Sequence, residues 1–276
     1  MTSSSSTPAS LDSDSDGKIG VFDSGLGGLT VVRHIRDLLP DADLVYIGDR
    51  QRAPYGPRPR AEVQVFSRQI TRRLIELGCS IVVIACNTAS AAALHEMRAE
   101  FPDITFVGME PAVKPATHAT ETGVVGVLAT NGTLDGPLYE SVVQRFGSGA
   151  LVLGEAAPEW VEYVERGETS GPALREAIGR HLEPLLDAGA DRIVLGCTHF
   201  PVLRPAIDDW LRGRAEVIDP GPAVARQTRR VAELRGSVDG SGSLVLELTG
   251  SRDGLEAVLT AVGLASPTGV VVSELT

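Results

Sequence analysis

Short apolar runs alternate along the chain with longer segments in which apolar residues recur every three or four positions. Residues 60–77 illustrate the second kind, because their apolar members follow the period of a helix: Val63, Phe66, Ile70, Leu74 and Leu77. The same spacing predicts a helix over residues 28–39. The short runs predict strands near residues 19–22, 44–47, 81–85, 104–107, 124–128, 150–153, 192–196, 216–218, 243–248 and 269–274. This alternation is typical of α/β proteins whose parallel sheets are covered on both faces.

Two stretches of this pattern occur twice. IVVIACNT at residues 81–88 resembles IVLGCTH at 193–199, and GVFDSG at 20–25 resembles GVLATN at 126–131, at nearly the same offset. Apolar strands can look alike by chance, but a shared offset favours duplication. We therefore predict two similar parallel-sheet α/β domains related by pseudo-two-fold symmetry. Their active site is expected in the cleft between them, beyond the carboxyl ends of the strands.

The predicted first domain comprises residues 18–110 plus 220–276, and the second comprises residues 111–219. Residues 1–17 are rich in serine and aspartate, so we predict a disordered tail there. Apolar residues make up 43% of the 276 residues, which is enough to form a core in each domain.

Charge and composition exclude several classes of function. The net charge is −11 and no basic stripe is present, which argues against a nucleic-acid binder. No apolar run approaches the length of a membrane span, and the first residues lack the pattern of a secretory signal, so we expect a cytoplasmic protein without membrane contact. The only lysines are Lys18 and Lys114, neither in a phosphate-binding context, which disfavours a pyridoxal phosphate enzyme.

Two of the three cysteines stand where chemistry is expected. Cys86 and Cys197 each end a predicted strand and precede a predicted helix, with Pro201 in the first turn of the second helix. Free N–H groups and the helix dipole at such a position lower the pKa of a thiol. The alternative is a pair of buried, inert cysteines, as we interpret Cys79.

Two further alternatives involve the same cysteines. Zinc could be held by Cys86, Cys197 and His199, but the chain has no C-x-x-C or H-x-x-x-H pair. A Cys86–Cys197 disulfide is disfavoured by a reducing compartment.

A glycine-rich segment, DSGLGGLT, occupies residues 23–30 between the first strand and the first helix. It is not a dinucleotide fingerprint, because Thr30 replaces the third glycine, and it lacks the P-loop lysine. Its N–H groups at a helix N-terminus suit a carboxylate. Asp23 is there either a cap-like structural residue or a proton-handling group, and Asp49 begins a polar loop.

The remaining titratable groups are less specific. His199 lies two residues from Cys197 and could act as its base or hydrogen-bond partner. Glu165 on its own could be a surface helix charge. The other histidines are interpreted as solvated helix residues: His34, His95, His118 and His181.

Four motifs in register identify the chain as similar to the glutamate racemases, within the aspartate/glutamate racemase family. They are FDSGLGGLTV at 22–31, PYG at 54–56, ACNTAS at 85–90 and LGCTHFP at 195–201. This resemblance implies cofactor-independent and metal-free inversion of glutamate at Cα, which supplies D-glutamate for peptidoglycan and cell shape. It also implies a cytoplasmic homodimer.

The resemblance also implies roles for individual residues. Cys86 and Cys197 match the two catalytic acid/bases, Asp23 and His199 match assisting residues beside them, and Asp49 and Glu165 match secondary positions. The matched substrate-binding positions are Asp23, Ser24, Pro54, Tyr55, Gly56, Asn87, Thr88, Thr130, Thr133, Thr198 and His199. The stretch before Glu165 departs from the family, because APEWVE at 157–162 stands where the family has an apolar stretch after a cysteine.

Two functions of other classes compete with this one. A cysteine-nucleophile hydrolase or lyase would form a covalent bond to one cysteine only. A carboxylate-binding protein would bind glutamate without exchanging its Cα hydrogen.

Overall fold

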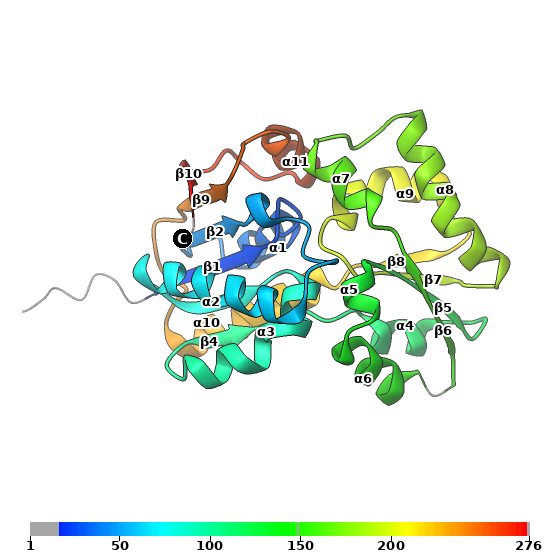
Figure 1. Ribbon diagram of the computed structural model, residues 1–276, viewed down its shortest axis with the longest axis horizontal. Coiled ribbons are helices and arrows are strands. Elements are labelled where there is room, and N and C mark those ends of the chain that lie inside the picture. Colours follow the sequence, from blue (N-terminus) through cyan, green and yellow to red (C-terminus); the bar gives the residue numbers. More distant parts are fainter. Residues whose placement is uncertain (1–16, 148, 275–276) are drawn as a thin grey trace, which may run out of the picture.

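The computed structural model describes residues 17–147 and 149–274, whose strands form two parallel sheets (Figure 1). Sixteen of the seventeen residues of the predicted N-terminal tail lie outside the described residues. The larger sheet has the order β10 (Gly269–Ser273), β9 (Leu244–Thr249), β2 (Leu44–Gly48), β1 (Lys18–Asp23), β3 (Cys79–Ile84) and β4 (Thr105–Val107). The smaller sheet has the order β6 (Leu151–Ala156), β5 (Val124–Ala129), β7 (Arg192–Leu195) and β8 (Glu216–Ile218). All ten predicted strands are confirmed.

The two sheets repeat one strand order. In the larger sheet, β2, β1, β3 and β4 are neighbours in that order, and in the smaller sheet β6, β5, β7 and β8 follow the same order. In each set, the strand that comes first in the sequence, β1 or β5, lies between the second and the third, and the three strands are parallel. This confirms two similar parallel α/β units, in which β1 corresponds to β5 and β3 to β7.

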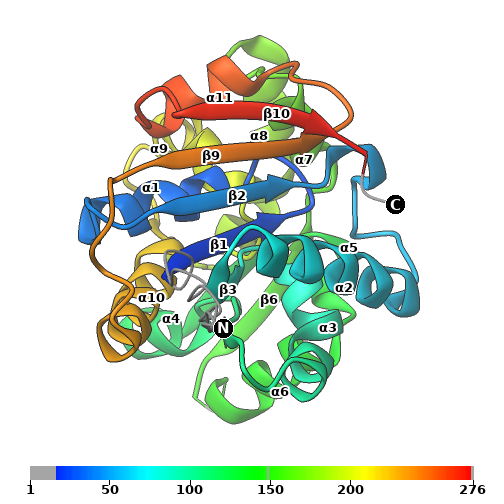
Figure 2. The same cartoon turned by 90° about the vertical axis from the view of Figure 1, so that its left-hand side faces the viewer.

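The larger sheet is extended by β9 and β10 from the C-terminal part of the chain, and Figure 2 shows these strands stacked above β2. The chain thus leaves the first unit after β4 and returns to it after β8. All strands of the larger sheet lie within the predicted first domain, and all strands of the smaller sheet lie within the predicted second domain. The exact domain boundaries stay a prediction.

Helices cover both faces of the sheets. Those of the first unit are α1 (Leu29–Leu38), α2 (Arg60–Glu76), α3 (Asn87–Glu100), α10 (Gly221–Arg235) and α11 (Leu255–Val262). Those of the second unit are α4 (Val113–Ala119), α5 (Asn131–Leu134), α6 (Pro137–Phe146), α7 (Glu159–Glu165), α8 (Pro172–Asp187) and α9 (Arg204–Leu211). Two short 3₁₀ helices, η1 (Arg50–Arg52) and η2 (Phe200–Leu203), follow β2 and β7.

Strand β1 shows why the apolar runs are continuous. Ile19 and Val21 point into the core that contains α1 and α10, while Phe22 points into the core that contains α2 and α3. Successive side chains of a strand point to opposite faces, so a strand buried on both faces must be apolar at every position. The sequence pattern therefore places β1 inside the sheet, and its carboxyl end then carries Asp23 into the space between the two units.

Candidate active site

The carboxyl ends of corresponding strands in the two units meet at one small cavity. Cys86 follows β3 and Cys197 follows β7, and both line this cavity. The other lining residues are Ser24, Pro54, Tyr55, Gly56, Asn87, Thr88, Thr130, Thr133, Val161, Thr198 and His199. The structure thus brings together every substrate-binding position inferred from the resemblance except Asp23, which lies fully buried behind the cavity.

Cys86 is the N-cap residue of α3, as its position in the sequence predicts. Its Sγ accepts a hydrogen bond from the Ala89 N–H at 3.4 Å, and its thiol donates to Ser24 Oγ at 3.8 Å. The predicted lowering of its pKa is wrong. Burial and the neighbouring Asp23 carboxylate raise the pKa of Cys86 well above its ordinary value, and the contact with Ala89 does not offset them. Cys86 is therefore a neutral thiol at neutral pH.

Cys197 has different surroundings. The segment after it begins with the 3₁₀ turn η2, which includes Pro201, so Cys197 is not the N-cap of an α-helix as Cys86 is. Its partner is His199, whose Nδ1 lies 3.7 Å from Sγ. Burial lowers the pKa of His199, but its hydrogen bonds with Cys197 and Glu165 outweigh burial and hold that pKa well above its usual range. His199 therefore carries a positive charge at neutral pH, and this charge lies beside the sulfur of Cys197.

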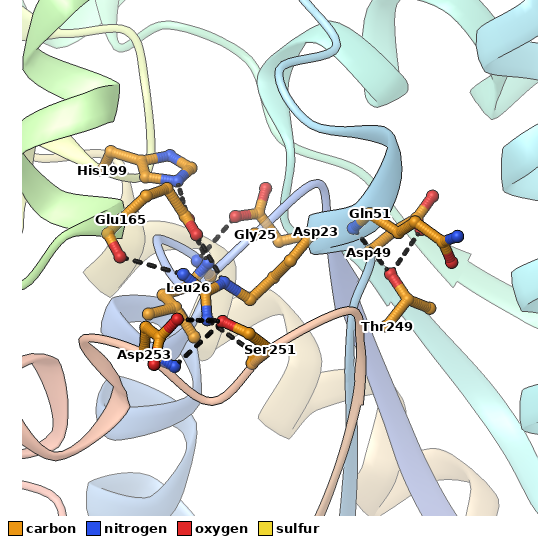
Figure 3. Close-up of polar contacts among 12 residues, drawn as sticks. Asp23, Gly25, Leu26, Asp49, Gln51, Glu165, His199, Thr249, Ser251 and Asp253 are labelled. Carbon is orange, nitrogen blue, oxygen red and sulfur yellow. Dashed lines mark hydrogen bonds and ion pairs between the residues drawn. The ribbon is translucent and has the colours of Figure 1, made fainter. Parts of the chain in front are cut away.

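Glu165, the last residue of α7, contacts Nε2 of His199, the ring nitrogen that does not face Cys197 (Figure 3). His199 Nε2 lies 2.7 Å from Glu165 Oε1, which also accepts the Leu26 N–H at 2.6 Å. Arg50 Nε donates to Glu165 Oε2 at 2.7 Å. Burial raises the pKa of Glu165, but these partners lower it below its ordinary value. The structure therefore excludes the alternative of a solvated surface charge.

The glycine-rich segment serves packing between the two units. A Cβ on Gly25 would lie 2.0 Å from Glu165 Oε1, and one on Gly27 would lie 2.5 Å from His199 Nδ1. Only glycine allows the second unit to approach this closely. In this loop the Leu26 N–H donates to the carboxylate of Glu165, and the Gly28 N–H donates to the carboxylate of Asp23. These two N–H groups are therefore not free to bind a substrate carboxylate, as the sequence suggested they would be.

Asp23 connects the two units. Its Oδ2 accepts the Gly28 N–H at 2.9 Å, and its Oδ1 accepts the Thr198 hydroxyl at 3.3 Å. Thr198 lies between Cys197 and His199, so the carboxylate at the end of β1 is bonded to the cysteine segment of the other unit. Asp23 also acts on Cys86 by its charge.

Asp49 does not contact either cysteine. Its carboxylate accepts hydrogen bonds from Tyr55 Oη at 2.5 Å, Arg52 Nε at 2.6 Å and Thr249 Oγ1 at 2.9 Å. Burial and the charge of Asp49 raise the pKa of Tyr55, so this phenol stays neutral. Asp49 therefore fixes a wall of the cavity through Tyr55, and Figure 3 shows its contact with Thr249.

The remaining polar groups of the cavity come from both units. Thr88 Oγ1 lies 3.3 Å from the hydroxyls of Thr130 and Thr133, which are 3.3 Å from each other. Asn87 Nδ2 donates to Met109 Sδ at 3.2 Å, while its buried Oδ1 has no partner among the described residues. The cavity wall thus has hydroxyl groups and one unpaired acceptor available to a polar ligand.

An outer cavity of about 500 Å³ adjoins this one. It shares Pro54, Gly56, Thr130 and Val161 with the inner cavity, and it is also lined by Arg50, Glu162, Glu165 and Ser251. Sequence reasoning missed Val161 and Arg50. Val161 follows the ordinary apolar spacing of a helix, and an arginine in a polar loop is usually solvated, so neither carried a distinguishing signal.

One histidine outside the cavity was misinterpreted. His181 is held between Glu155, 2.8 Å from Nδ1, and Glu159, 2.7 Å from Nε2, with its ring against the edge of Trp160. It therefore joins α8 to β6 and α7, where the sequence suggested a solvated residue.

Two other expectations concern metal and membrane contact. Across residues 17–147 and 149–274, no three His, Cys, Asp or Glu side chains are arranged to hold a metal ion, and the three cysteines are free. None of the helices described is long and apolar enough to cross a membrane.

Comparisons with known proteins agree on one family. A profile described as Asp/Glu/hydantoin racemase matches residues 29–228. A glutamate racemase of Roseiflexus sp. (strain RS-1) is 44% identical over 84% of this chain and 87% of its own length, and one of Ectopseudomonas mendocina (strain ymp) is 45% identical over 79% and 82%.

Solved structures of glutamate racemases are similar over nearly the whole chain. The Escherichia coli enzyme, in complex with L-glutamate and the activator UDP-MurNAc-Ala, has a TM-score of 0.85 and 31% identity, covering 95% of this chain and 99% of its own. The Francisella tularensis enzyme, in complex with D-glutamate, has a TM-score of 0.81 and 26% identity, covering 95% and 98%.

Proposed function

The chain belongs to the Asp/Glu/hydantoin racemase family, and from that premise we propose that it interconverts L-glutamate and D-glutamate by proton transfer at Cα between two cysteines. The observation that carries this proposal is the shared cavity of Cys86 and Cys197. Each follows the corresponding strand of a different unit, so the two thiols reach the cavity from the two units. A substrate carbon between them can lose a proton on one face and gain one on the other.

The proton balance follows from the unequal surroundings of the cysteines. In the proposed turnover, Cys197, which lies beside protonated His199, removes the Cα proton. Cys86, buried beside Asp23, starts as a thiol and delivers its proton to the opposite face. After this turnover Cys86 is the thiolate and Cys197 the thiol, which is the state that binds and converts the opposite enantiomer. Approach distances near 3–3.5 Å on each side require the two sulfurs to lie about 6–7 Å apart.

The substrate's polar groups match the cavity wall. We propose that the hydroxyls of Ser24, Thr88, Thr130, Thr133 and Thr198, together with backbone N–H groups, hold its carboxylates. Asn87 Oδ1, buried and unpaired, would accept from the substrate ammonium. Pro54, Tyr55 and Gly56 form the wall that Asp49 supports. With a net charge of −11, the chain needs such a local cradle to bind an anionic substrate.

The wider role follows from the family. We propose that the product D-glutamate supplies peptidoglycan synthesis and so maintains cell shape, in a cytoplasmic homodimer. Residues 18–110 plus 220–276 and residues 111–219 would then act as two domains that close on the substrate. Complexes of the Escherichia coli and Francisella tularensis enzymes with L- and D-glutamate support the choice of substrate.

The test is incubation of purified full-length protein with L-glutamate in D₂O, without added cofactor, following optical rotation and loss of the Cα–H signal. We expect racemisation with deuterium incorporation, and little of either with aspartate. Cys86→Ala and Cys197→Ala should each abolish racemisation, because each removes one of the two proton carriers. Full turnover by either variant would contradict the two-base scheme.

Two controls separate the competing functions. A covalent adduct on one cysteine, seen as a mass shift during turnover, would support a cysteine-nucleophile hydrolase or lyase. Glutamate binding without deuterium incorporation would support a carboxylate-binding protein.

A further inference from the structure

Arg50 makes contacts that no step of the proposed reaction uses. It begins η1, directly after Asp49, and its side chain is largely buried between three segments. Nε donates to Glu165 Oε2 at 2.7 Å, Nη2 donates to the Glu165 backbone carbonyl at 2.9 Å, and Nη1 donates to the Ser251 carbonyl at 2.6 Å. Arg50 thus joins the first unit, the end of α7 in the second unit and the loop between β9 and α11.

We propose that Arg50 is a positioning residue for the Cys197 half of the site, acting through Glu165 and His199. This inference rests on the proposed racemase function. Glu165 Oε1 is shared by His199 and the Leu26 N–H, which leaves Oε2 to Arg50. The guanidinium therefore fixes the rotation of the carboxylate that holds His199 against Cys197.

The geometry argues against two simpler roles for Arg50. A substrate-binding arginine points its donors at the ligand, but three of the five N–H groups of Arg50, one on each nitrogen, already donate to protein acceptors. Arg50 also lines the outer cavity and not the inner one. A purely structural ion pair would not explain why the same carboxylate contacts the partner of Cys197.

A charge effect acts in the same direction as positioning. The guanidinium helps to lower the pKa of Glu165, which keeps this carboxylate ionised beside His199. Removing the cation and loosening the carboxylate both weaken the support for protonated His199, which lies against Cys197.

The test compares Arg50→Gln with Arg68→Gln in the full-length protein. Arg68 forms the same kind of pair, with Glu100 at 2.5 Å, but joins α2 to α3 on the surface. We expect Arg50→Gln to lower kcat by about tenfold to a hundredfold with little change in KM. The alkaline limb of the pH profile of kcat/KM should move to lower pH, because the loosened Glu165 carboxylate supports protonated His199 less well. Arg68→Gln should change neither.

A double-mutant cycle with Glu165→Gln decides whether Arg50 acts through Glu165. In the Glu165→Gln background, Arg50→Gln should cause little further loss of kcat, because the carboxylate that it positions is gone. Additive losses, an increase in KM alone, or an unmoved alkaline limb of the kcat/KM profile in the Arg50→Gln variant would each overturn the inference. Absence of racemisation by the wild-type protein would instead overturn the proposed function.

Discussion

Gly27→Ala tests the claim that the glycine-rich loop exists to let His199 approach. An alanine Cβ at this position would lie 2.5 Å from His199 Nδ1 and 2.6 Å from its backbone nitrogen. Ordinary contacts of a Cβ begin near 3.4 Å. Because a backbone atom cannot rotate away as a flexible side chain can, the two segments must separate by about 0.8 Å.

This displacement has consequences for both rate and stability. A misplacement near 1 Å in a catalytic group costs up to about a hundredfold in rate, so we expect kcat/KM to fall between about tenfold and a hundredfold. Overpacking of this kind costs about 1–3 kcal/mol of folding free energy. Racemisation by polarimetry and urea unfolding by circular dichroism measure the two effects on the same sample.

Two other glycine variants are compared with Gly27→Ala, and the first of them is the matched control. Gly269→Ala introduces a Cβ with nothing within 4 Å and should change neither quantity. At Gly25 the nearest atom is Glu165 Oε1, the end of a flexible side chain, so Gly25→Ala should reduce the rate with a smaller loss of stability. A folded Gly27→Ala enzyme with wild-type kcat/KM would refute the reasoning, because His199 would then not depend on this close approach.

Three further predictions concern titratable groups. Glu165→Gln removes a partner that raises the pKa of His199, so His199 should lose its proton at lower pH, and the alkaline limb of the kcat/KM profile should move to lower pH. An unmoved limb would show that the protonation of His199 does not control the rate. Burial raises the pKa of Cys79 to about 12, so this cysteine should resist iodoacetamide at pH 8, and Cys79→Ala should retain racemisation; rapid labelling of Cys79 would show that its site opens. Four hydrogen bonds from Ser241 and Ser243 lower the pKa of Asp43 from 3.8 to about 2, although burial acts in the opposite direction. Because the folded-state pKa of Asp43 is lowered, the ionised carboxylate stabilises the folded protein above pH 4, and this contribution is lost as the pH falls towards 2. The urea midpoint should therefore fall less between pH 4 and pH 2 in Asp43→Asn than in the wild-type protein.

The duplicated fold explains why the two cysteines are equivalent in position but not in chemistry. The shared strand order places both at the end of the third strand of a unit. The side chains around each sulfur differ, because Cys86 has the Ala89 N–H and Asp23 nearby while Cys197 has His199. In the proposed reaction, duplication supplies the two proton carriers, and divergence of their neighbours gives each cysteine its own contacts.

The sequence by itself determined the elements and the main candidates of the site. All ten strands could be predicted because burial on both faces requires continuous apolar runs, and helix α2 because its apolar residues keep one period. Cys86 and Cys197 could be placed at strand ends for the same local reason. The motifs around them then pointed to the residues that line the cavity.

Only the tertiary structure decided how those residues act on one another. Glu165 and Arg50 are 115 positions apart and Leu26 and Glu165 are 139 apart, so no local pattern connects them. The pKa of Cys86 could not be predicted from its helix N-terminus, because burial and the charge of Asp23 outweigh the helix contact. The two carboxylate partners of His181 could not be predicted either, because packing brings them from other elements, β6 and α7. Periodicity depends on neighbours in sequence, whereas desolvation and pairing depend on what packing brings near.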